Sequence, residues 1–271
     1  MTAVSRHNVS VSGLADGPPI VFVHGFGCDQ NMWRHVVPAF ETTHRVVLMD
    51  LIGAGGSDSA DFDAQRYASL DAYAADVTAV VRELDLREAV LVGHSVSTML
   101  VAMVQLAEPE RVASLVMVAP SPRYIDEPGY VGGFGEEDID ELLESLASNY
   151  LGWSAAMAPA IMANAERPDL GDELTASFCR MDPAIAQVFA DATFRSDSRS
   201  LLPQLDVPTL VLQCTDDVIA PIAVGEFVAD QVPRASLVLL DATGHCPHLS
   251  APEATTEAIV KFVRSSDRAS A

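Results

Sequence analysis

The chain has 271 residues, with 38 acidic and 16 basic side chains, a formal net charge of −22 and 49 % hydrophobic residues. This length suits one large domain or two small ones with a sizeable core, and the apolar content excludes a disordered chain. The acidic excess repels nucleic-acid phosphates and anionic membranes, so neither is an expected partner.

The sequence gives no sign of export or membrane insertion. No stretch approaches the roughly 20 apolar residues of a membrane helix, and residues 1–12 lack a signal-peptide pattern. The four cysteines are scattered without the spacing of a metal site, as in proteins of a reducing compartment. We therefore expect a cytoplasmic protein without a metal. These cysteines are Cys28, Cys179, Cys214 and Cys246.

Short apolar runs alternate with longer helical patterns along most of the chain. This alternation is typical of an α/β fold, in which a mostly parallel sheet carries helices on both faces. The predicted strands are 20–23, 46–50, 89–93, 115–119, 209–213 and 237–240. The predicted helices of this sheet are 70–84, 95–107, 223–231 and 252–264.

The alternation stops after residue 119 and resumes at 209. The segment between carries amphipathic helical patterns, the clearest at 136–150 and after Asp182-Pro183, with predicted breaks at Gly152, Arg167-Pro168 and Asp182-Pro183. Because such sheets bind ligands at the carboxyl ends of their strands, we interpret 121–198 as a helical lid over a core of 1–120 and 199–271. A helical subdomain packed elsewhere is the alternative.

The strongest chemical signal is Gly93-x-Ser95-x-Ser97, placed between a predicted strand and a predicted helix. A serine on such a tight turn projects its hydroxyl at the top of the sheet, as a nucleophile must. The usual last glycine of this motif is replaced by Ser97, which is small enough for the turn to close. The pattern predicts Ser95 as the nucleophile.

A serine nucleophile needs a base and an acid that orients it, in the chain order Ser, Asp, His. Asp217 follows one late strand and His245 follows the next, so they are the predicted acid and base. Asp216 and His248 are the second choices. A metal site at His245, Cys246 and His248 is disfavoured, because the hydrolytic set already accounts for His245.

The oxyanion of such a reaction is stabilised by backbone N–H groups near the nucleophile. The predicted donors are Phe26, in the glycine-bearing turn after the first parallel strand, and Val96, which follows the nucleophile. His24 and His94 stand at strand ends and are predicted to be structural. The glycine-rich loop 50–57 lacks the Gly-Lys-Ser/Thr ending of a phosphate loop.

From about residue 9 to 263 the chain resembles the RsbQ-like branch of the α/β-hydrolases, whose plant relatives are the karrikin and strigolactone receptors. The match rests on motifs around the predicted site and in the predicted lid. They are Gly25-Phe26-Gly27-Cys28-Asp29-Gln30, Phe40, Asp50, Gly53, Gly93-His94-Ser95-Val96, Val116-Met117-Val118-Ala119-Pro120-Ser121-Pro122, Gly132-Gly133-Phe134, Asn149-Tyr150-Leu151-Gly152-Trp153, Gln213-Cys214-Thr215-Asp216-Asp217 and Gly244-His245-Cys246-Pro247-His248.

The resemblance implies an α/β-hydrolase fold with a four-helix lid over an apolar cavity, and it favours Asp217 over Asp216 as the acid. It also implies a small hydrophobic ligand or substrate and a phosphatase-type signalling partner upstream of a stress sigma factor. Candidate cavity-wall residues, for each of which ordinary core packing is at least as strong an expectation, are Phe26, Phe134, Trp153, Phe189 and Phe194.

Three functions are compatible with these features. The first is a cofactor-free serine hydrolase that cleaves a small ester or lactone through an acyl-enzyme. The second is a ligand-gated signalling module in which hydrolysis is slow or secondary. The third is a cofactor-free haloperoxidase or C–C bond hydrolase, which nothing beyond the shared motif favours.

Overall fold

The computed structural model describes the backbone of residues 1–270 and the side chains of residues 1–266. One seven-stranded sheet runs through it in the order β1-β3-β2-β4-β5-β6-β7. Every neighbouring pair is parallel except β1 and β3. The strands are β1 (Ser10–Gly13), β2 (Pro19–Val23), β3 (Arg45–Met49), β4 (Ala89–His94), β5 (Val112–Val118), β6 (Thr209–Asp216) and β7 (Ala235–Thr243).

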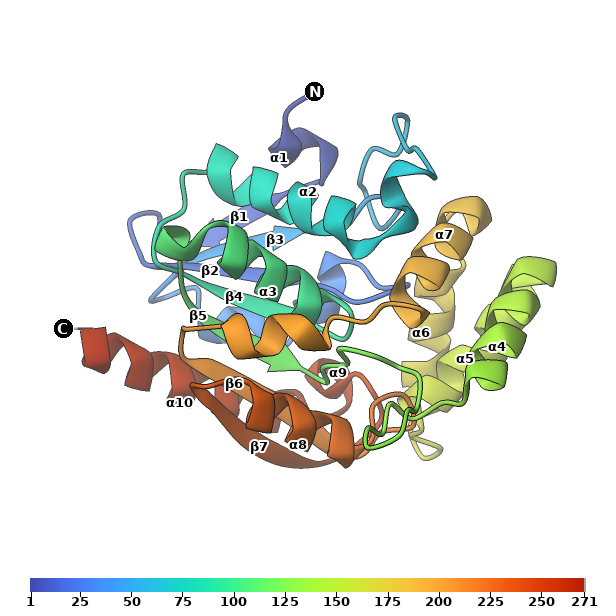
Figure 1. Cartoon of the computed structure of the whole chain (residues 1–271). Helices are drawn as coiled ribbons and strands as arrows, with labels where there is room; N and C mark the ends of the chain where they lie inside the picture. The colour runs from blue at the N-terminus through green and yellow to red at the C-terminus, as the bar shows by residue number, and fades with distance from the viewer. Residues whose placement is uncertain (271) are drawn as a thin grey trace.

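Helices cover both faces of this sheet and gather at one of its ends (Figure 1). They are α1 (Ala3–Arg6), α2 (Leu70–Glu83), α3 (Ser97–Ala107), α4 (Glu136–Ser148), α5 (Tyr150–Met162), α6 (Pro168–Phe178), α7 (Pro183–Phe194), α8 (Ile222–Gln231), α9 (Pro247–Ser250) and α10 (Pro252–Ser270). None of the helices in the described part of the chain is long and apolar enough to cross a bilayer.

The buried strands place alternate side chains in two separate cores, because successive residues of a strand point to opposite faces. On β2, Val21 and Val23 belong to the core that also contains residues of α2, α3 and α8. Ile20 and Phe22 belong to the core that contains residues of α10. Both faces are therefore covered, which explains why the strands are apolar without alternation.

All six strands predicted from the sequence are present, and the expected mostly parallel sheet with helices on both faces is confirmed. The seventh strand, β1, was missed because its four residues are all exposed and it pairs antiparallel at the sheet edge. The predicted helix break at Gly152 was wrong. Asn149 ends α4 and caps α5 by accepting a hydrogen bond from the Gly152 N–H, so this glycine lies in the first turn of α5.

Helices α4 to α7 form one insertion between β5 and β6. Figure 1 shows them together beyond one end of the sheet, and α7 contacts α2 through the stacked rings of Phe189 and Tyr73, 4.3 Å apart. The predicted breaks at Pro168 and Pro183 are the first residues of α6 and α7, where proline needs no hydrogen-bonded N–H. The insertion thus consists of four helices, as the resemblance implied.

Candidate active site

Ser95 occupies the sharp turn between β4 and α3. Its φ of +55° lies in the left-handed region, which is unfavourable for a residue with a side chain. The turn is tight enough that a Cβ on Gly93 would approach the Ser97 carbonyl oxygen to 2.4 Å. Glycine is therefore required two residues before Ser95. The strain is localised at the residue whose hydroxyl the turn presents.

Ser97 takes the place of the usual last glycine and makes a contact that glycine cannot make. Its hydroxyl donates a hydrogen bond of 2.5 Å to the carbonyl oxygen of His24, at the end of β2. The Ser97 side chain is fully buried. The serine at this position therefore joins the turn at Ser95 to the segment that leads to Phe26.

The three residues predicted as nucleophile, base and acid lie in one hydrogen-bonded chain. The Ser95 Oγ is 2.7 Å from His245 Nε2, and His245 Nδ1 is 2.8 Å from Asp217 Oδ2. An ionised carboxylate can only accept, so Nδ1 carries the ring proton and Nε2 is free to accept from the Ser95 hydroxyl. All three side chains are buried.

Asp217 is held in its charged form. Burial acts to raise the pKa of its carboxyl, but attraction to His245, the hydrogen bond with it and two backbone hydrogen bonds together outweigh burial, so the net pKa is lowered. The backbone N–H groups of Ile219 and Ala220 donate to its other oxygen at 2.9 and 3.1 Å. The aspartate is thus fixed by the loop that follows β6.

The second-choice acid and base lie apart from Ser95. Asp216 is exposed at the end of β6. His248 is fully buried on α9, where its ring stacks on Trp33 at 4.6 Å. Burial holds its pKa well below the usual value for histidine. The geometry therefore favours Asp217 and His245.

Two backbone N–H groups beside Ser95 are free to bind an anion. In the described part of the chain, the N–H groups of Phe26 and Val96 donate to no protein acceptor. The N–H of Ser95 itself is used, since it donates to the Val118 carbonyl oxygen at 2.9 Å. This leaves the pair predicted from the sequence as the available donors.

His24, predicted to be structural, is held in a neutral form away from the reacting atoms. Its Nδ1 donates to the Gly25 carbonyl oxygen and its Nε2 accepts from the Leu51 N–H, at 2.8 and 3.0 Å. Burial lowers its pKa. His24 thus fixes the start of the loop that carries Phe26.

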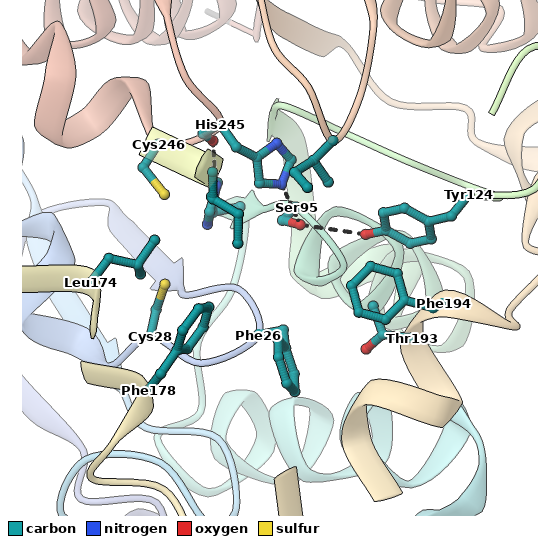
Figure 2. A pocket seen from close by; sticks show the side chains of 13 residues that line it. Phe26, Cys28, Ser95, Tyr124, Leu174, Phe178, Thr193, Phe194, His245 and Cys246 are labelled. Atoms are coloured by element: carbon teal, nitrogen blue, oxygen red, sulfur yellow. Dashed lines mark hydrogen bonds between the residues drawn. The ribbon is translucent and has the colours of Figure 1, made fainter. Parts of the chain in front are cut away.

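A cavity opens onto the Ser95 hydroxyl between the sheet and the helical insertion (Figure 2). Its central free space of about 30 Å³ holds about two water molecules, whereas pockets that enclose drug-sized ligands measure roughly 300–1,000 Å³. An ester of several carbons must therefore displace side chains or helices to enter. The lining residues are Phe26, Cys28, His94, Ser95, Tyr124, Ile161, Leu174, Phe178, Thr193, Phe194, Ile219, His245 and Cys246.

Of the five aromatic residues suggested as cavity wall, Phe26 and Phe194 line it. Trp153 and Phe189 do not line it and pack against Phe26, at ring distances of 6.2 and 5.5 Å. Phe134 packs against the main core. Two of the five suggested residues therefore line the cavity, and the other three pack elsewhere in the apolar interior.

Sequence reasoning missed Tyr124, whose hydroxyl lies 3.4 Å from the Ser95 Oγ. Because Ser95 uses its proton toward His245, Tyr124 is the donor in this contact. Burial raises the pKa of Tyr124, so it remains protonated. Phe178 of α6, which lines the cavity, was also not predicted from the sequence. Neither residue stands in a motif that periodicity or spacing could single out.

The insertion contacts the loop that carries His245, the predicted base. The His245 N–H donates to the Ile161 carbonyl oxygen at 3.0 Å, and a Cβ on Gly244 would approach the Met162 carbonyl oxygen to 2.1 Å. Asn164 also donates to the Thr243 carbonyl oxygen at 2.9 Å. The end of α5 therefore sets the position of His245.

Residues 18–252 match the family described as alpha/beta hydrolase fold, and the chain belongs to this family. It is 37 % identical to a probable esterase, D14L, from Oryza sativa subsp. japonica, over 95 % of this chain and 96 % of the relative. It is 35 % identical to karrikin insensitive 2 receptor CA of Petunia hybrida, over 95 % of each. Among solved structures, a hydrolase from Oleispira antarctica matches with a TM-score of 0.93 and 38 % identity, over 97 % of this chain and 96 % of that one.

Proposed function

We propose that this protein is a serine hydrolase that cleaves a small hydrophobic carboxylic ester or lactone through an acyl-enzyme. The observation that carries the proposal is the continuous hydrogen-bonded chain from Ser95 through His245 to Asp217, with Ser95 on a strained turn. Relatives named as esterase and hydrolase support the same reaction class.

In the first half of the reaction, the Ser95 Oγ attacks the carbonyl carbon of the substrate while its proton passes to His245 Nε2. Asp217 stabilises the imidazolium that results. The negative charge that develops on the substrate oxygen is accepted by the free N–H groups of Phe26 and Val96. His245 then returns the proton to the leaving alkoxide, and Ser95 remains acylated.

In the second half, a water molecule gives a proton to His245 and attacks the acyl carbon. Collapse of the second oxyanion breaks the bond to Ser95, whose oxygen takes the proton back from His245. No step uses a metal or an organic cofactor. Tyr124, which contacts the Ser95 Oγ, is positioned to orient the nucleophile between turnovers.

We further propose that residues 121–198 form a lid over the core of 1–120 and 199–271. The support is the position of Ile161, Leu174, Phe178 and Phe194, which come from three helices of the insertion and line the same cavity as Ser95. The small free volume favours a small apolar substrate, and entry of a larger one requires the lid to move.

The decisive kinetic comparison uses two neighbouring aspartates. With p-nitrophenyl acetate as substrate, Ser95→Ala is expected to abolish turnover above background. Asp217→Asn is expected to lower kcat by roughly 10³–10⁴-fold, because the histidine loses its orienting carboxylate. Asp216→Asn, a change of the same chemistry at the exposed neighbour, is expected to stay within about twofold of wild type. Full activity of Ser95→Ala contradicts the proposal.

A second candidate is a ligand-gated signalling module, and a specific observation favours it. The base is hydrogen-bonded to the insertion through the His245–Ile161 contact, so events at the site can change the lid. A relative named as a receptor supports this alternative. In this function a cytoplasmic phosphatase-type partner in stress regulation reads the lid surface.

The two candidates differ in rate and in the need for Ser95. Signalling predicts turnover of a panel of small esters and lactones far below the roughly 10 s⁻¹ that is typical of enzymes, with ligand-dependent hydrogen exchange in α4–α7 that persists in Ser95→Ala. The signalling function is contradicted if a panel member is turned over fast and the ligand leaves hydrogen exchange in α4–α7 of Ser95→Ala unchanged.

A further inference from the structure

Three potential metal ligands lie together in the cavity wall. They are Cys28, in the loop after β2; His94, the last residue of β4; and Cys246, which precedes α9. Their ligand atoms all lie within 4.8 Å of one another, and each residue is at most 3 % exposed. Figure 2 shows both sulfur atoms on one side of the cavity, across the view from Tyr124. The three come from separate segments, so sequence spacing could not reveal them.

His94 presents the lone pair that a metal ion requires. Its Nε2 lies 2.8 Å from the His245 carbonyl oxygen, which can only accept, so Nε2 carries the proton. In the neutral ring Nδ1 is then an acceptor, and it has no nitrogen or oxygen partner in the described part of the chain. Metal-binding histidines commonly donate their second N–H to a backbone carbonyl in this manner, which fixes the tautomer.

We propose that Cys28, His94 and Cys246 form a binding site for a thiophilic divalent cation, with Zn²⁺ as the best match. Two thiolates and one imidazole are a donor set that Zn²⁺ prefers, and a fourth position facing the cavity remains for water or another ligand. Zn–S and Zn–N bonds of about 2.3 and 2.0 Å place tetrahedral ligands roughly 3.5–3.8 Å apart. The three donors reach this spacing with movements of about 1 Å.

Charge balance suits the buried setting of this site. Two thiolates offset the 2+ charge of the ion, so the occupied site adds no net charge to an apolar cavity. Both thiols must lose their protons when the ion binds, and binding therefore weakens as pH falls. The site differs from the combination of His245, Cys246 and His248, because His245 is bonded to Asp217 and His248 is stacked on Trp33.

An ion at this site would act on the proposed reaction. His94 and Cys246 are the chain neighbours of Ser95 and His245, and Cys28 lies two residues after Phe26. The ion and its fourth ligand would share the cavity that the substrate must enter. Zn²⁺ is therefore expected to inhibit hydrolysis reversibly. This consequence rests on the proposed function, whereas the binding site itself does not.

The binding test uses reduced protein carrying Ser95→Ala, which separates metal binding from hydrolysis. Titration with Co²⁺ is expected to saturate at one equivalent of metal. The bound ion should show a thiolate-to-cobalt charge-transfer band and the visible bands of tetrahedral cobalt, and added Zn²⁺ should remove both. Cys28→Ser and Cys246→Ser are each expected to lose the charge-transfer intensity of one thiolate and weaken binding at least tenfold. Cys179→Ser, at the exposed cysteine outside the cavity, is the matched control and retains the full signal. A band unchanged in the Cys28→Ser, Cys246→Ser double variant overturns the proposal.

A measurement on the unaltered cysteines covers the case in which these variants fail to fold. Alkylation by iodoacetamide is followed at each cysteine by peptide mass, with and without Zn²⁺. Protection of Cys28 and Cys246, but not of Cys179, supports the site, and equal rates with and without Zn²⁺ overturn it. In the protein with Ser95 intact, ester hydrolysis should fall as Zn²⁺ is added and return with a chelator. If the protein does not hydrolyse esters, the cobalt spectrum still tests the metal site, because it does not depend on hydrolysis.

Discussion

The backbone N–H of His245 donates a hydrogen bond to the carbonyl oxygen of Ile161, at 3.0 Å. One residue belongs to the loop after the last strand and the other to α5 of the insertion. The proposed base is therefore positioned by the same segment that lines the cavity. This contact lets the helical insertion influence the proposed catalysis without supplying a reacting group.

The variant Gly244→Ala tests the coupling between α5 and the His245 loop. The φ of Gly244 is +94° and a side chain there would meet the Met162 carbonyl oxygen at 2.1 Å, so Gly244→Ala must push α5 and the His245 loop apart. A displacement of about 1 Å at a catalytic group is expected to lower kcat/KM by roughly 100-fold. Steady-state hydrolysis of p-nitrophenyl acetate measures the change.

Gly129→Ala is the control for backbone strain alone. Gly129 also has a positive φ, of +85°, but a Cβ there has no atom within 4 Å among the described residues. Its kcat/KM should remain near that of wild type, apart from a modest loss of stability. Equal kinetic losses in the two variants would show that the close approach at Gly244 does not matter.

Ser97→Ala tests the link between the nucleophile turn and β2. The change leaves the buried His24 carbonyl oxygen without its donor, so the free energy of unfolding should fall by about 1–3 kcal/mol in denaturant titration. Ser114→Ala is the matched control, because the buried Ser114 hydroxyl has no hydrogen-bond partner in the described part of the chain. If Ser114→Ala costs as much as Ser97→Ala, the hydrogen bond to His24 is not the reason.

Tyr124→Phe removes the hydroxyl that contacts Ser95 while keeping the ring. Loss of one hydrogen bond worth about 0.5–1.5 kcal/mol predicts a roughly 2- to 10-fold decrease in kcat/KM. Tyr73→Phe removes an equally buried hydroxyl that has no partner among the described residues, and it should leave the rate unchanged. Unaltered kinetics in Tyr124→Phe would mean that Tyr124 only fills space.

Acid stability reports on Asp217. Its pKa is lower in the folded protein than the value of about 3.9 in an unfolded chain, so it stabilises the fold above that pH. The stabilisation is lost as the pH falls below about 4 and through the folded-state pKa. Urea unfolding from pH 5 to 2 should show a shallower loss in Asp217→Asn than in wild type or Asp216→Asn. Parallel curves for all three would contradict the lowered pKa.

Sequence reasoning predicted the parts of this molecule that depend on local pattern. Apolar runs such as that of β4 are short and continuous, and the turn at Ser95 that follows β4 requires residues that a motif can specify. Asp217 and His245 were chosen because they follow strands in a fixed order, and the structure places both in one hydrogen-bonded chain with Ser95. The exposed strand β1 and the start of α5 at Tyr150 were not predicted, because the strand depends on pairing and the helix start on capping rather than on periodicity.

The cavity surface could not be predicted for a different reason. Tyr124 and Phe178 reach Ser95 and its cavity from segments whose position depends on how the insertion packs. The same holds for the cluster of Cys28, His94 and Cys246, whose members are far apart in sequence. Contacts of this kind follow from tertiary packing and carry no signal in the spacing of residues.

Labelling with an alkyl fluorophosphonate tests most directly that Ser95 is a nucleophile activated by His245. The reagent loses fluoride to an activated serine hydroxyl and leaves a stable phosphonate, which intact-mass and peptide analysis can locate. We expect one label per chain at Ser95, none in Ser95→Ala, and much slower labelling in His245→Ala. Folded wild-type protein that stays unlabelled, or that carries its label at another residue, would show that Ser95 is not an activated nucleophile.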